Sequence, residues 1–302
     1  MDDRTSTGPS MVKIGKAQNE ESSLRRYLAA DHYYGIAKLL HYGGAALTVV
    51  LALVSPLVLL FVPDVGPTLG AIAGAWLFGS RLLLEPVKRQ LQLKGATAQE
   101  MFDCGIFELG WNETLARPLS EEEVRGASGS MKHAERVRDW YPTSKEMPWP
   151  KSVLVCQRSN AVWARRQHRV YSRVLLVAAG AWAIIGVIVA VVDGASLADY
   201  LVTIALPSLP ALLDATEFAR AHSSDAEKRQ LLEDKLNGHL RDGTAISQDL
   251  REIQDQLFNL RRDAPLVPGW FYALVRRRFE EDMRYAAERA AESGSSGQVR
   301  DE

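Results

Sequence analysis

The sequence predicts an all-α membrane protein in which two transmembrane helical hairpins, four spans in all, carry a helical cytoplasmic body. Apolar stretches occur in two close pairs, residues 43–62 with 67–84 and residues 174–192 with 200–213. Only a few residues connect the two members of each pair. Because about 20 apolar residues at 1.5 Å rise per residue cross a hydrocarbon core about 30 Å thick, each pair is typical of a membrane hairpin.

The first member of each pair gives the stronger prediction. Residues 43–62 and 174–192 contain no ionisable side chain, and a soluble protein of this size rarely needs a helix that is apolar on every face. Charged and proline residues mark the second members, namely Arg81, Glu85, Asp199, Pro207, Pro210 and Asp214. A buried hairpin of a soluble core is the alternative for these two stretches. We favour the return span, because a chain that has crossed the bilayer must otherwise stay outside.

Loop charge predicts the orientation. The connectors 63–66 and 193–198 contain Asp64 and Asp193 but neither Lys nor Arg, whereas basic residues crowd the other flanks of the hairpins. The positive-inside rule therefore places both termini and the long middle segment in the cytoplasm. The first forty residues lack a basic start followed by an apolar core, so we expect no cleaved signal peptide. Cys104 and Cys156 would lie on the reducing side and stay free thiols.

The predicted organisation has seven segments. They are a disordered N-terminus (1–20), a cytoplasmic helix (21–42), the first hairpin (43–87), a cytoplasmic middle segment (88–171), the second hairpin (172–216), a helical C-terminal segment (217–290) and a disordered tail (291–302). The net charge of −1 gives no reason to expect a nucleic-acid polymer as partner.

Within the C-terminal segment, one helix has a regular apolar stripe. Ile246, Leu250, Ile253, Leu257 and Leu260 follow a 4, 3, 4, 3 spacing that resembles a coiled-coil seam. Gly243 is the predicted end of the helix before it. Residues 269–289 form a predicted final amphipathic helix.

No catalytic constellation is recognisable. The cysteines and histidines lack metal-ligand spacing, and there is no phosphate loop or nucleophile motif, so we expect neither an enzyme nor a metal site. Ligand-binding candidates are instead basic, aromatic and amide residues, because guanidinium groups fit phosphates and rings stack on bases. They are Trp140, Tyr141, Arg158, Asn160, Trp163, Arg261, Arg262 and Trp270. The alternative for the rings is a packed core, and for the arginines it is contact with anionic lipids.

Four short motifs carry a resemblance to a known family. They are FDCGIFELGWN (102–112), DWYP (139–142), VCQRSNAVW (155–163) and QDQLFNLRRDAPLVPGWFY (254–272). In this order around two hairpins they resemble the SMODS-associated four-transmembrane effectors of bacterial antiphage systems. The resemblance implies that a cognate nucleotidyltransferase makes a cyclic di- or oligonucleotide, which the effector binds in order to permeabilise the inner membrane. No other cofactor is implied.

A single subunit with four helices encloses too little space for a water-filled pore, so the pore hypothesis requires a homo-oligomer in the bilayer. The less apolar second spans would then line it, with Arg81, Glu85, Asp199, Pro207 and Pro210 as the candidate pore-lining residues. A membrane-anchored scaffold that uses the coiled-coil-like helix as its partner surface is the competing hypothesis. A small transporter and an enzyme follow with less support.

Overall fold

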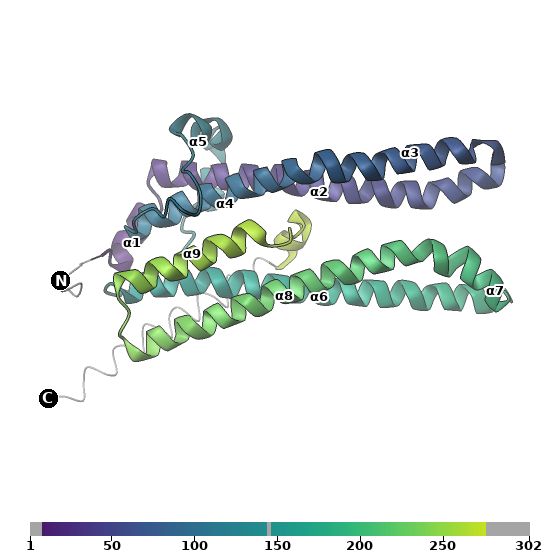
Figure 1. Ribbon diagram of the computed structural model, residues 1–302. Coiled ribbons are helices and arrows are strands. Elements are labelled where there is room, and N and C mark those ends of the chain that lie inside the picture. The colour runs from purple at the N-terminus through teal and green to yellow at the C-terminus, as the bar shows by residue number, and fades with distance from the viewer. Residues whose placement is uncertain (1–7, 144–145, 276–302) are drawn as a thin grey trace.

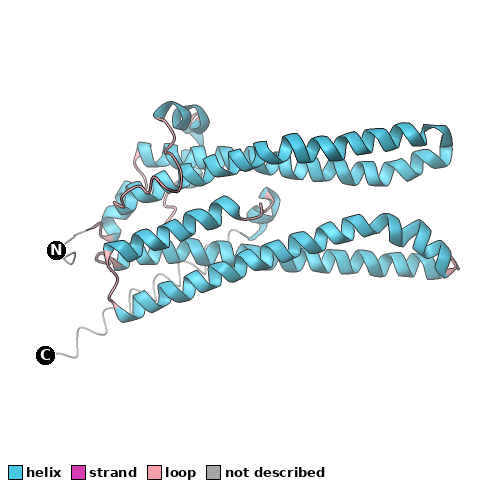
Figure 2. Ribbon diagram, viewed as in Figure 1, coloured by secondary structure: helices cyan, strands magenta, loops and turns pink. Residues whose placement is uncertain are grey.

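The computed structural model describes residues 8–143 and 146–275 of the 302-residue chain. Over these residues the regular structure is helical (Figure 2). Two long helical hairpins leave a common body and extend in the same direction, so that both tips lie at one end of the molecule (Figure 1). Hairpin 1 comes from the first third of the chain and hairpin 2 from the middle and later parts.

Hairpin 1 begins with α2 (Glu21–Phe61), whose 41 residues reach about 60 Å at 1.5 Å per residue. That length covers both the body and a bilayer core. The tip is η2 (Pro63–Val65), and the chain returns through α3 (Gly66–Gly79), η3 (Ser80–Leu84) and α4 (Glu85–Phe107). Trp76 Nε1 donates to Thr48 Oγ1 at 3.0 Å, which ties the returning helix to α2.

Hairpin 2 repeats this plan. It begins with α6 (Lys151–Val192), turns, and returns through α7 (Leu197–Tyr200), η5 (Leu201–Ala205) and α8 (Leu206–Asp242). Trp182 Nε1 donates to Ser208 Oγ at 3.2 Å across it. Gly243, with φ of 64°, ends α8 in the left-handed conformation, as predicted.

Both returning helices contain a five-residue π-helical segment, and a proline is the second residue after it. In hairpin 1, η3 leads into α4 with Pro86, and in hairpin 2, η5 leads into α8 with Pro207. Proline has no backbone N–H and its ring clashes with the carbonyl four residues earlier. The wider π turn relieves that clash without breaking the helix.

The prediction of four spans is supported only in part. Among the described residues, two helical stretches are long and apolar enough to cross a bilayer, Gly66–Phe107 and Lys151–Val192. Only the first part of α8 is apolar before Asp214 and Glu217, and several side chains in the apolar half of α2 lie outside the described part. Four membrane crossings therefore remain a prediction.

The outer half of α6 is apolar and uncovered. Val177, Ile184 and Val191 are 71%, 61% and 73% exposed, and large aliphatic side chains stand out on both hairpins. Burying such surface in lipid is strongly favourable, at about 25 cal/mol per Å². An aqueous surface would not tolerate a continuous apolar sleeve of this kind.

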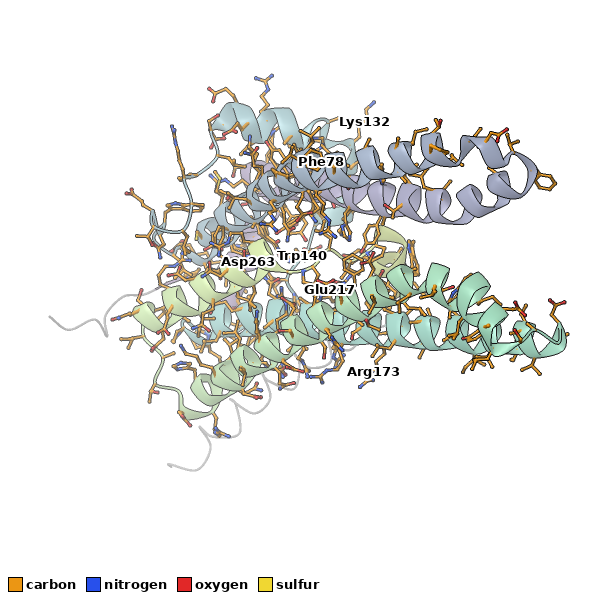
Figure 3. The ribbon with its side chains drawn as sticks, turned by 45° about the vertical axis from the view of Figure 1, so that its right-hand side comes forward. Phe78, Lys132, Trp140, Arg173, Glu217 and Asp263 are labelled. Atoms are coloured by element: carbon orange, nitrogen blue, oxygen red, sulfur yellow. The ribbon has the colours of Figure 1, made fainter. Side chains whose placement is uncertain are left out.

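Shorter helices pack onto the inner halves of the long ones and complete the body. They are α1 (Met11–Ala17), α5 (Glu121–Ser128), η4 (Met131–Val137) and α9 (Ser247–Asp263). The body is densely filled with side chains, among them Trp140 (Figure 3). Its core combines Phe102, Phe107, Tyr141, Leu154 and Leu236, all at most 2% exposed. The aromatic residues of the middle segment therefore form a packed core.

The predicted disorder of residues 1–20 is wrong from Ser10 onward. Ser10 caps α1 by accepting from the backbone N–H of Lys13, and Met11 and Ile14 are fully buried in the main core. Burial of two apolar side chains outweighs the polar composition of the first ten residues. Residues 1–7 and the predicted disordered tail, 291–302, lie outside the described residues.

The apolar stripe of α9 packs inside the molecule. Leu250, Ile253 and Leu257 have no exposed surface and belong to the main core, while Ile246 is 36% exposed at the start of the helix. The stripe is thus an intramolecular seam, and it no longer supports a scaffold with a coiled-coil partner surface. Of the predicted final helix 269–289, residues 269–275 are described and helical.

Candidate ligand-binding site

A network of buried charges joins α9 to α4. Arg261 Nη2 lies 2.6 Å from Asp103 Oδ2 and its Nη1 lies 3.6 Å from Glu100 Oε2. Arg251 Nη2 lies 2.5 Å from Glu100 Oε1, and Gln254 Nε2 donates to both carboxylates at 2.8 and 3.0 Å. Their positions in the sequence place Arg251, Gln254 and Arg261 on one face of α9, and they place Glu100 and Asp103 on one face of α4. Arg251 Nη2 also lies 2.7 Å from Asp255 Oδ1, so two guanidinium groups pair with three carboxylates.

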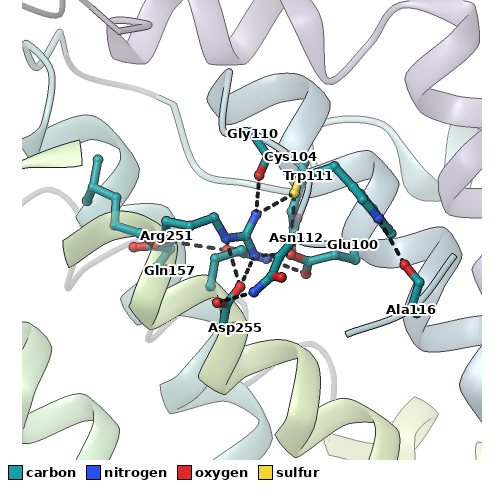
Figure 4. Close-up of polar contacts among 12 residues, drawn as sticks. Glu100, Cys104, Gly110, Trp111, Asn112, Ala116, Gln157, Arg251 and Asp255 are labelled. Atoms are coloured by element: carbon teal, nitrogen blue, oxygen red, sulfur yellow. Dashed lines mark hydrogen bonds and ion pairs between the residues drawn. The ribbon is translucent and has the colours of Figure 1, made fainter. Parts of the chain in front are cut away.

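The edge of this network extends to the loop after α4 (Figure 4). Arg251 Nη1 donates to the Gly110 carbonyl at 2.9 Å and contacts Cys104 Sγ at 3.0 Å. Asn112 Nδ2 donates to Asp255 Oδ2 at 2.7 Å. Contacts from α9 thus fix the conformation of the end of the first sequence motif, residues 102–112.

Tyr141 and Asn160 belong to the same network. The Tyr141 hydroxyl donates to Asp103 Oδ1 at 2.7 Å, and Asn160 Nδ2 donates to the Tyr141 oxygen. Gln18 holds the Tyr141 backbone through two hydrogen bonds of 2.8 and 3.2 Å. Burial, with Asp103 adding to it, raises the pKa of Tyr141 well above its usual range. The ring is 1% exposed, so its donors and acceptors are engaged by the protein itself.

The side chains of this network are paired with one another and are not accessible to a ligand. Burial raises the pKa of Glu100, while Arg261 acts in the opposite direction. Burial alone would lower the pKa of Arg261, but Asp103 and its neighbours raise it above the ordinary value. Because its side chain is 6% exposed and ion-paired with two carboxylates, Arg261 is a structural residue here and offers no open surface to a ligand.

Arg158 lies in a second cluster, along the seam between α6 and α8. Its Nη2 lies 3.2 Å from Glu233 Oε1, and its Nε donates to Asn237 Oδ1 at 2.6 Å. Arg165, two turns further along α6, places Nε 2.8 Å from the other oxygen of the same carboxylate. The side chains of Arg158 and Arg165 keep 25% and 15% of their surface exposed.

The contacts described for the other candidates are with different residues. Arg262 pairs with Asp263 at 2.7 Å, and Trp140 packs on Tyr27 with ring centroids 4.5 Å apart. Trp163 contacts Tyr272 at 5.9 Å, and Trp270 is 64% exposed. The structure therefore brings together Tyr141, Asn160 and Arg261 but does not unite the eight candidates in one site.

Sequence reasoning missed a buried histidine pair at the base of hairpin 2. His168 Nδ1 and His222 Nδ1 are 2.8 Å apart, which requires one to donate and the other to accept. His168 Nε2 lies 3.4 Å from Asp225, whose carboxylate pairs with Arg229 at 2.5 Å. Burial lowers the pKa of both histidines, that of His222 to about 4. The 54-residue separation of the pair leaves no local signal.

In the described part of the chain, no group of three or more His, Cys, Asp or Glu side chains is arranged to hold a metal ion. The described residues form two hairpins with exposed apolar side chains and a helical body that contains buried ion pairs. These features are typical of helical membrane-associated proteins with a polar helical body outside the bilayer.

Comparison with known proteins gives the family. Residues 12–290 match the SMODS-associating 4TM effector domain, and the chain belongs to this family. A relative from Bacillus cereus strain VD146, named as a probable CBASS effector molecule, is 26% identical over 281 residues, which cover 88% of this chain and 94% of the relative. No solved structure matches the chain.

Proposed function

We propose that this protein is an antiphage effector that permeabilises the bacterial inner membrane when it binds a cyclic oligonucleotide made by a cognate nucleotidyltransferase. The observation that carries the proposal is the uncovered apolar outer half of α6, joined to a polar body at the inner end. Family membership and the CBASS effector named among its relatives supply the antiphage context.

In this proposal the chain crosses the membrane four times, with both termini and the body in the cytoplasm. The two tips carry Asp64 and Asp193 without a basic residue, while Arg89 and Arg173 stand where the hairpins leave the body. Arg173 and Glu217 lie at that end of hairpin 2 (Figure 3). Such a distribution follows the positive-inside rule.

Conduction requires several subunits, because the helices of one chain leave no water-filled channel. The polar groups of the returning helices lie near the ends of the apolar stretch. Arg81 lies in η3, and Glu85 pairs with Lys88 and Arg89 at 2.5 and 3.0 Å at the inner end. Ser196 is the N-cap of α7 at the outer tip, and the Asp199 carboxylate accepts a hydrogen bond from its backbone N–H. Pro207 and Pro210 lie in the first turns of α8, so these five candidates would form the two mouths of an oligomeric pore.

Dye release from liposomes tests the proposal. The full-length protein is reconstituted into phosphatidylethanolamine and phosphatidylglycerol vesicles, and a panel of cyclic di- and trinucleotides is added. We expect release with one member of the panel and none without it. Release that never depends on the panel would contradict the trigger, and vesicles that stay sealed under every condition would contradict permeabilisation.

A matched pair of variants separates membrane insertion from general damage. Ile184→Lys places a charge on the outer half of α6, where Ile184 is 61% exposed, and a central lysine costs about 2.5 to 3.5 kcal/mol of insertion free energy. Leu231→Lys makes the same change at a 71% exposed site in the inner part of α8. We expect the first to reduce insertion and release and the second to leave both intact.

A further inference from the structure

The seam between α6 and α8 holds more positive than negative charge. Arg158 and Arg165 share the single carboxylate of Glu233, one oxygen each, at 3.2 and 2.8 Å. Within the described part of the chain, one carboxylate for two guanidinium groups leaves the pair with one more positive than negative charge. Arg169 follows one turn later on α6 and has no acidic partner within residues 8–143 and 146–275. Burial lowers the pKa of Arg165, and its arginine neighbours on α6 lower it further against the pull of Glu233.

Each guanidinium of the pair keeps donors for a ligand. Arg158 uses Nε on Asn237 and Nη2 on Glu233, while Arg165 donates Nη1 to Gln230 and holds Nε against Glu233 as an ion pair without a hydrogen bond. Nη1 of Arg158 and Nη2 of Arg165 have no bonding partner among the described residues, and neither nitrogen is buried. The rigid fork of N–H donors on arginine matches the oxygens of a phosphate group.

The position of the pair along α6 favours a soluble ligand over a lipid headgroup. The apolar stretch of α6 begins at Val174, and at 1.5 Å per residue Arg158 lies about 24 Å before it and Arg165 about 14 Å before it. Arg173, adjacent to the apolar stretch and exposed, is the residue placed for anionic headgroups. A headgroup at the membrane surface cannot reach Arg158.

We propose that Arg158 and Arg165, held on Glu233, are the phosphate-binding site of this protein and receive the phosphodiester groups of the activating cyclic oligonucleotide. The identity of the ligand rests on the proposed function, whereas the phosphate chemistry rests on the seam itself. A bound phosphate competes with Glu233 for the two forks. Because Glu233 is the residue of α8 that both arginines hold, binding weakens the attachment of α8 to α6 directly beneath hairpin 2.

Calorimetric titration of the full-length protein in detergent micelles with the panel of cyclic di- and trinucleotides tests the site. We expect Arg158→Gln and Arg165→Gln each to weaken binding at least tenfold, and Arg158→Lys, which keeps the charge but loses the fork, to weaken it less. The control is Arg241→Gln, which changes an 80% exposed arginine near the end of α8 that pairs with Asp242, and the affinity should not change.

Glu233→Gln gives the opposite and more diagnostic result. Removal of the competing carboxylate should tighten binding several-fold, an outcome that misfolding cannot produce. Unchanged affinity in both arginine-to-glutamine variants would overturn the site while leaving the cyclic-oligonucleotide trigger intact. If the wild type binds no member of the panel, the trigger fails, and the same variants are titrated with inorganic pyrophosphate. Pyrophosphate binding that Arg158→Gln abolishes supports the site, and binding that is absent or insensitive to this change overturns it.

Discussion

Loss of the Arg261 side chain should destabilise the body severely. In Arg261→Met, Asp103 loses a partner at 2.6 Å while it stays fully buried, and Glu100, with a side chain 3% exposed, loses its second guanidinium. Removing one member of a buried ion pair typically costs 3 to 5 kcal/mol, because the remaining charge is left uncompensated. Tyr141 and Gln254 still donate to Asp103, so we expect the lower end, about 3 kcal/mol.

Denaturant unfolding of the protein in detergent micelles, followed by tryptophan fluorescence, measures this loss. The double variant Asp103→Asn with Arg261→Met removes the orphaned charge and should recover part of the stability, giving a clear interaction energy in the double-mutant cycle. Arg262→Met is the matched control, since Arg262 pairs with Asp263 at the surface and should cost less than about 1 kcal/mol. A loss below about 1 kcal/mol in Arg261→Met would refute the reasoning that this network fastens α9 to α4.

Three further outcomes are expected. Because burial lowers the pKa of His168 and His222, these histidines take up protons in the unfolded chain at a higher pH than in the folded protein, and the free energy of unfolding should fall as the pH decreases from 6.5 toward the His222 pKa of about 4. Thermal melts should show that the stability of His222→Gln depends less on pH than that of the wild type. Identical pH profiles would contradict this reasoning. Leu257→Ala should cost about 2 to 5 kcal/mol in denaturant unfolding because Leu257 has no exposed surface, whereas Ile246→Ala should cost far less, and equal losses would contradict the intramolecular seam. Gly95→Val should cost about 1 to 3 kcal/mol, since an added Cβ would meet the Tyr34 ring at 3.1 Å, with Gly126→Val, at a site open to solvent, as the comparison.

The sequence was sufficient to predict what depends on local pattern. Apolar runs identified the outer halves of α2 and α6, and Gly243 correctly marked the end of α8. The stripe on α9 is an apolar seam as predicted, and only the competing scaffold hypothesis gives it an external partner, because a 4, 3 spacing specifies an apolar face and not what covers it. The helix α1 was missed because two apolar residues in a polar stretch give no periodic signal, although Ser10 was an available capping residue.

The polar clusters could not be predicted from the chain, because they join residues far apart in it. The sequence suggests Arg261 as a ligand-binding residue because of its guanidinium group, yet in the structure this group forms an ion pair with Asp103, which is far away in the sequence. Glu100 and Asp103 gave one available signal, two acids a single turn apart in the last part of α4, where most of the neighbouring residues are apolar. Arg158 was selected for the same chemistry as Arg261 and kept accessible donors. The difference lies in exposure, which sequence does not report.

The π segments of the two returning helices have a mechanical consequence. A π turn holds one more residue than an α turn, and each residue of an α-helix advances the chain by about 100° and 1.5 Å. If η3 or η5 changed into ordinary α-helix, the helix beyond it would rotate about its axis by about 100° and shift along it by about 1.5 Å. A different face of that helix would then pack against its neighbours. Since η3 lies near the inner end of hairpin 1 and η5 near the outer tip of hairpin 2, the two arms would twist at different depths.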